Sequence, residues 1–71
     1  MTGVPIWVVY DHPRDFPSNY VARLWLNDQR TDTLMICPDL DRLRAEINRR
    51  GATAKLLPSE GDDPVILETW L

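Results

Sequence analysis

One segment of this chain has the spacing of apolar residues that an amphipathic helix requires. Leu40, Leu43 and Ile47 recur at positions i, i+3 and i+7 and form a single apolar stripe, flanked by charged and amide side chains. Asp39 is placed to cap the start of this helix, and Gly51 to end it in the left-handed conformation. A helix with one apolar stripe covers one face of another element, which has to come from the rest of the chain.

The other apolar segments are short and rich in β-branched and aromatic residues. They predict five strands, at residues 6–10, 20–26, 33–37, 54–57 and 65–71. Polar segments that contain Pro, Asn and Asp separate them, at residues 13–19, 27–32 and 58–64. The predicted fold is therefore a single α+β domain over residues 1–71, in which a small antiparallel sheet of about five strands, in β-β-β-α-β-β order, packs one helix on one face.

Length, composition and charge exclude several classes of protein. A chain of 71 residues buries only about 60% of the surface that its unfolded form exposes, so marginal stability is expected, which a dimer would relieve. Its 44% hydrophobic and 27% charged residues are typical of a folded domain. The net charge of -3 opposes non-specific attraction to a phosphate backbone, so no nucleic-acid partner is expected.

The cellular compartment is predicted from cysteine usage and hydropathy. The lone Cys37 cannot form an internal disulfide, which favours a reducing compartment, and the cytoplasm is the expected location. No apolar run reaches the roughly 18 residues of a membrane span, and the N-terminus lacks the basic and apolar pattern of a signal peptide. No membrane partner is therefore expected.

Polar side chains are predicted to gather at one end of the sheet, because alternating strands bring three connections to the same end. These rim residues are Asp11, His12, Arg14, Asp15, Cys37, Asp39, Glu60, Asp62 and Asp63. His12 with the carboxylates of Asp11, Asp62 and Asp63 suits a metal ion, and Cys37 with His12 is the one possible pair of nucleophile and base. An Asp before Pro is also a common turn former, and a lone Cys a common core residue.

The alternation of side chains along each strand predicts which residues face the helix. One face collects Ile6, Val8, Tyr10, Leu24, Leu26, Val65 and Leu67 and is expected to receive the helix. The other collects Trp7, Val9, Val21, Arg23, Trp25, Ile66, Glu68 and Trp70, so all three tryptophans are predicted on the uncovered face, where Arg23 and Glu68 are expected to pair across strands.

An uncovered face with three tryptophans would be a large apolar patch, which monomers seldom expose. Three kinds of cover remain open: the loop that carries Phe16, a second copy of the chain, or a ligand or partner protein. The first hypothesis is therefore a non-enzymatic binding or interaction module, homodimeric or with an unidentified protein partner, whose candidate binding residues are Trp7, Arg23, Trp25, Glu68 and Trp70. The alternative is a small enzyme or metal-binding protein that acts through the rim at His12, Cys37, Asp11, Asp62 and Asp63.

No catalytic motif supports the alternative hypothesis. The chain has only three glycines, with no phosphate-cradling loop and no zinc-ligand spacing, so no catalytic residue is assigned and no cofactor is expected.

Three stretches of the sequence resemble a known family. They are DHPRDFP at residues 11–17, VARLW at residues 21–25 and DDPVILETWL at residues 62–71. Together they resemble a family of short uncharacterised bacterial proteins, over nearly the whole chain, and this resemblance implies no activity. The β-β-β-α order is also similar to that of the HicB-type antitoxin domain, although the chain has none of that domain's characteristic stretches.

Overall fold

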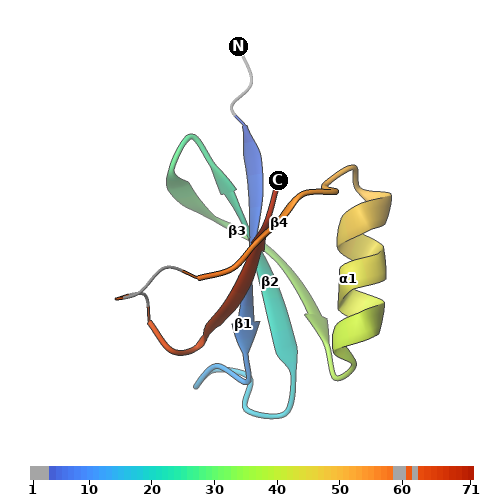
Figure 1. Ribbon diagram of the computed structural model, residues 1–71. Coiled ribbons are helices and arrows are strands. Elements are labelled where there is room, and N and C mark those ends of the chain that lie inside the picture. Colours follow the sequence, from blue (N-terminus) through green and yellow to red (C-terminus); the bar gives the residue numbers. More distant parts are fainter. Residues whose placement is uncertain (1–3, 59–60, 62) are drawn as a thin grey trace.

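The computed structural model describes residues 4–58, 61 and 63–71. Within these residues the elements are β1 (Pro5–Asp11), β2 (Tyr20–Leu26), β3 (Gln29–Cys37), α1 (Leu40–Arg49), β4 (Lys55–Leu56) and β5 (Ile66–Trp70). The five strands form one antiparallel sheet in the order β3-β2-β1-β5-β4 (Figure 1). The predicted α+β class and element order are confirmed. No helix in the described part of the chain is long and apolar enough to cross a membrane.

The turn between β2 and β3 is shorter than the polar sequence suggests. Asn27 and Asp28 both have positive φ, 52° and 62°, which is the conformation of a two-residue hairpin turn whose twist matches that of the strands. β3 therefore starts at Gln29, whereas the sequence predicts a turn over residues 27–32 and a strand from residue 33. The polar residues that follow the turn belong to an exposed edge strand.

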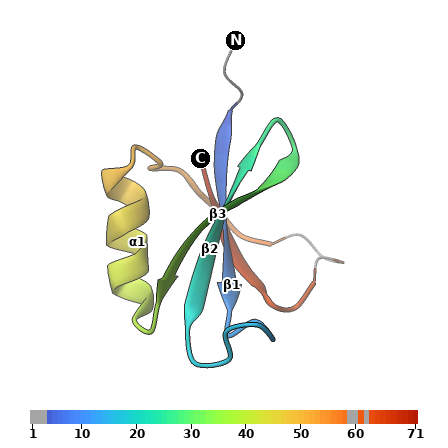
Figure 2. The same ribbon diagram turned by 180° about the vertical axis from the view of Figure 1, so that it is seen from behind.

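The predicted ends of the helix are confirmed by its capping contacts. The side chain of Asp39 accepts a hydrogen bond from the backbone nitrogen of Asp41 at 3.0 Å, and Gly51 has a φ of 102°. Leu43 and Ile47 on the apolar stripe are 2% and 0% exposed, and burial of each contributes roughly 1.5–3 kcal/mol. The helix packs against β2 and β3 on one side of the sheet (Figure 2).

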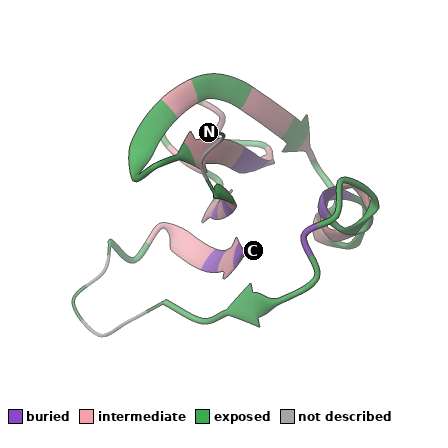
Figure 3. Ribbon diagram, turned by 90° about the horizontal axis from the view of Figure 1, so that it is seen from above, coloured by how far each residue is buried: buried purple, intermediate pink, exposed green. Residues whose placement is uncertain are grey.

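The core lies between α1 and one face of the sheet. Its buried residues are Trp7, Val9, Ala22, Leu43, Ile47, Ala52 and Trp70. Seen from above, the sheet is strongly twisted, β3 and β4 are its outer strands, and α1 lies to one side (Figure 3).

The predicted assignment of the two faces is wrong for β1 and for the end of β5. Trp7 lies opposite Leu24 and also opposite Trp70, so odd-numbered residues of β1 share a face with even-numbered residues of β2. It is therefore Trp7 and Val9 that face α1, not the predicted Ile6, Val8 and Tyr10. Because β1 is apolar at both parities, its sequence does not show which face is inward, and the register with β2 decides.

Candidate functional site

The sheet face opposite α1, here called the open face, is the surface of the chain that its own helix leaves uncovered. The strand registers place twelve side chains on it: Ile6, Val8, Tyr10, Val21, Arg23, Trp25, Arg30, Leu34, Ile36, Leu56, Ile66 and Thr69. Only Val21 is buried, and Ile36 is 45% exposed. On the helix face, by contrast, Trp7, Val9, Ala22 and Trp70 are all at most 8% exposed. The open face therefore keeps apolar side chains accessible.

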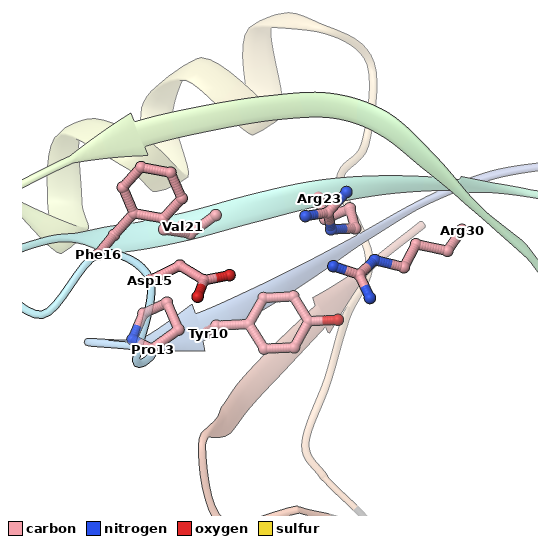
Figure 4. Close-up of a pocket in the computed structure, with 7 residues that line it drawn as sticks. All are labelled: Tyr10, Pro13, Asp15, Phe16, Val21, Arg23 and Arg30. Carbon is pink, nitrogen blue, oxygen red and sulfur yellow. The ribbon is translucent and has the colours of Figure 1, made fainter.

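A pocket of about 120 Å³ lies on the open face, beside the connection between β1 and β2. Its lining residues are Tyr10, Pro13, Asp15, Phe16, Val21, Arg23 and Arg30 (Figure 4). The connection is held in shape by hydrogen bonds from the backbone nitrogen of His12 to the oxygen of Asn19 and from that of Phe16 to the oxygen of Pro13. Phe16 lies beside Val21, so the loop lines part of the open face (Figure 4).

Charged groups of opposite sign line this pocket. Arg23 on β2 and Arg30 on β3 lie on one side of it and Asp15 on the other, with the ring of Tyr10 along it and its hydroxyl toward the arginines (Figure 4). Arg23 donates from Nη1 to the backbone oxygen of Thr31 at 2.6 Å, which fixes its guanidinium group. Within residues 4–58, 61 and 63–71, none of these three charged side chains forms an ion pair. Among the described residues, therefore, the pocket presents charges of both signs that no ion pair neutralises.

Trp25 is the tryptophan on the open face, and its indole nitrogen is unusual. Nε1 is buried but has no hydrogen-bond partner among the described residues. A buried donor without an acceptor costs about 1–3 kcal/mol. The residue as a whole is only partly buried.

Glu68, predicted on the uncovered face beside Arg23, instead lies buried on the helix face at 2% exposure. Its carboxylate accepts hydrogen bonds from Nε and Nη2 of Arg44, at 3.0 and 2.6 Å, and from Nε1 of Trp70 at 2.6 Å. Burial alone would raise the pKa of Glu68, but the hydrogen bonds from Arg44 and Trp70 outweigh it and hold that pKa below its usual value. The predicted pair of Arg23 and Glu68 is therefore wrong.

The other predicted binding residues divide between the two faces. Trp7 and Trp70 belong to the core, and the guanidinium carbon of Arg50 lies 5.7 Å from the ring centroid of Trp7 in a cation–π contact. The prediction that all three tryptophans share the uncovered face is therefore wrong. Of the five candidates, Arg23 and Trp25 lie on the open face.

Of the described rim residues, Asp11 and Cys37 lie at the same end of the sheet. Asp11 lies opposite Tyr20, which lies opposite Cys37, and the backbone nitrogen of Asp11 donates to the oxygen of Val65. His12 contacts the carboxylate of Asp11 and stacks edge-on against Tyr20.

The rim offers little chemistry in the part of the chain that the structure describes. Cys37 packs against the core, and no group of three His, Cys, Asp or Glu side chains lies close enough there to hold a metal ion. Asp39 acts as the helix cap. Glu60 and Asp62 lie outside the described residues.

Sequence reasoning does not identify Tyr10 and Arg30 as pocket residues. Tyr10 is predicted to face the helix. Arg30 falls in a segment predicted as a turn and is therefore not assigned to either face of the sheet. The sequence signal that could have placed Arg30 in a strand is the pair Asn27 and Asp28. Both residue types tolerate a positive φ, so they permit a two-residue turn, after which the strand begins at residue 29.

Comparison with known proteins adds no relative. No family model matches the chain, and searches of curated proteins and of solved structures found no match.

Proposed function

We propose that this protein is a non-enzymatic binding module and that the open face is its binding surface. The observation that carries the proposal is the asymmetry of the sheet: α1 buries one face, while the other keeps aromatic and aliphatic side chains accessible around a charged pocket. Accessible apolar surface of this kind is typical of interaction sites. Tyr, Trp and Arg, the residue types that dominate binding energy at interfaces, are represented here by Tyr10, Trp25 and Arg23.

The size of the pocket supports a protein partner rather than a small-molecule ligand. Pockets for such ligands usually have volumes of about 300–1,000 Å³, whereas this one has about 120 Å³. It is large enough for a single side chain. We therefore expect the pocket to be one feature of a broader protein contact over the open face.

A pair of charge-introducing variants tests this proposal. Ile36→Glu places a carboxylate on the open face, and Leu57→Glu places one at a side chain that is 75% exposed and follows β4. Sedimentation over a range of concentrations measures self-association, and affinity capture from the source cells with quantitative mass spectrometry measures other partners. We expect Ile36→Glu to lose an association that the wild type and Leu57→Glu both keep. Identical behaviour of all three proteins would contradict the proposal.

A further inference from the structure

The charges around the pocket restrict which surface can cover the open face. Arg30 and Asp15 are both exposed at the edges of one pocket, and they carry opposite charges. A uniformly acidic partner surface would attract Arg30 but repel Asp15, and a uniformly basic one would do the reverse. A matching surface has to present both signs of charge at a corresponding spacing, together with apolar area.

The chain itself carries such a surface. In a two-fold symmetric contact the same patch is used on both copies, so that residue i of one copy meets residue j of the other and j meets i. We propose that a second copy of this chain covers the open face, with Asp15 of each copy paired with Arg30 of the other. This inference rests on the proposed function of the open face and names its occupant.

The apolar and the charged residues have different roles in this contact. Side chains such as Ile36 and Trp25 supply apolar area, whose removal from water drives association. The two ion pairs fix the orientation of the copies, because a rotated arrangement would place like charges together. Arg23 is already held by the backbone oxygen of Thr31, so the exposed Arg30 is the arginine available to reach the second copy.

Charge reversal tests the pairing directly. Asp15→Arg alone places only positive groups at the proposed contact. Arg30→Asp alone places only negative groups there, because Asp15 of each copy then faces an aspartate at position 30 of the other. We expect each single variant to raise the dissociation constant of the homodimer at least about tenfold, measured by sedimentation at physiological salt. An equimolar mixture of the two variants restores both pairs and should form a heterodimer. The double variant should form a homodimer again.

Several outcomes separate this inference from the proposed function. If the wild type stays monomeric but captures a different protein that Ile36→Glu loses, the homodimer is wrong and the binding face stands. Single variants that dimerise as tightly as the wild type, or a mixture that gives no heterodimer, would also overturn the pairing. Circular dichroism and urea unfolding of each variant serve as controls that test whether the folded state is intact.

Discussion

Arg44 on α1 holds both carboxylate oxygens of Glu68 on β5, with Nη2 to Oε1 at 2.6 Å and Nε to Oε2 at 3.0 Å. The two residues are 24 positions apart in sequence, so this paired contact joins the helix to the sheet. Trp70 donates a third hydrogen bond to the same carboxylate. A buried carboxylate with three donors of this kind is well satisfied, and the cost of desolvating it is offset only while its partners remain.

Removal of the guanidinium group should therefore be costly. Arg44→Met leaves the carboxylate of Glu68 buried without its cation, and we expect the free energy of unfolding to fall by about 3 kcal/mol, the lower end for a broken buried pair, because the Arg44 side chain is 34% exposed. Arg49→Met is the matched control: Arg49 pairs with Glu46 on the same helix but is 77% exposed, and we expect a change within about 0.5 kcal/mol. Urea unfolding measures both. Equal changes in unfolding free energy would show that the buried pair of Arg44 and Glu68 contributes no more to stability than the exposed pair.

The same carboxylate predicts an acid-sensitive stability. Because the pKa of Glu68 is lower in the folded protein than its ordinary value of 4.5, the ionised group stabilises the fold above that value, and this contribution is lost as the pH falls through the folded pKa. We expect the free energy of unfolding to decrease more steeply below about pH 4.5 in the wild type than in Glu68→Gln. Parallel curves between pH 6 and 3 would contradict the role of Glu68.

The tryptophans on the two faces should respond differently to loss of the indole nitrogen. Trp25→Phe removes a buried donor that has no acceptor among the described residues, which is stabilising, but it also removes part of the apolar ring, which is destabilising. The two effects oppose each other, so we expect a net change of less than about 1 kcal/mol in unfolding free energy. Trp70→Phe removes the hydrogen bond to Glu68 and leaves a cavity in the core, so we expect a loss of about 2–3 kcal/mol. Similar losses at both positions would show that Trp25 has an unseen acceptor.

The parts of the fold that are predictable from sequence depend on local interactions. The capping residue Asp39, the apolar stripe that includes Leu43, and Gly51 lie within one helix and its flanks, so short-range physics is enough to set the helix bounds. The α+β class follows because the remaining apolar segments have strand character.

The faces and the pocket depend on register, which the local sequence does not determine. β1 is apolar at both parities, and the eight-residue connection before β2, residues 12–19, permits more than one pairing, so the assignment of Trp7 and Tyr10 is reversed. Glu68 illustrates the same limit, because its buried partner Arg44 comes from a distant helix rather than from a neighbouring strand. The pocket brings together Asp15 of the loop and Arg30 of β3, and this also depends on a strand register that the sequence does not determine.

The turn between β2 and β3 gives a prediction that tests the start of β3, on which Arg30 depends. Asp28 has a φ of 62°, a conformation that Gly adopts without strain, Asp tolerates and Ala disfavours. We expect Asp28→Gly to raise the free energy of unfolding by about 0.5 kcal/mol, because Asn-Gly suits a two-residue hairpin turn better. Asp28→Ala should lower it by about 1 kcal/mol. If β3 instead began at residue 33 after a longer turn, Asp28 would not need a positive φ, and the Gly and Ala variants would differ little in thermal unfolding.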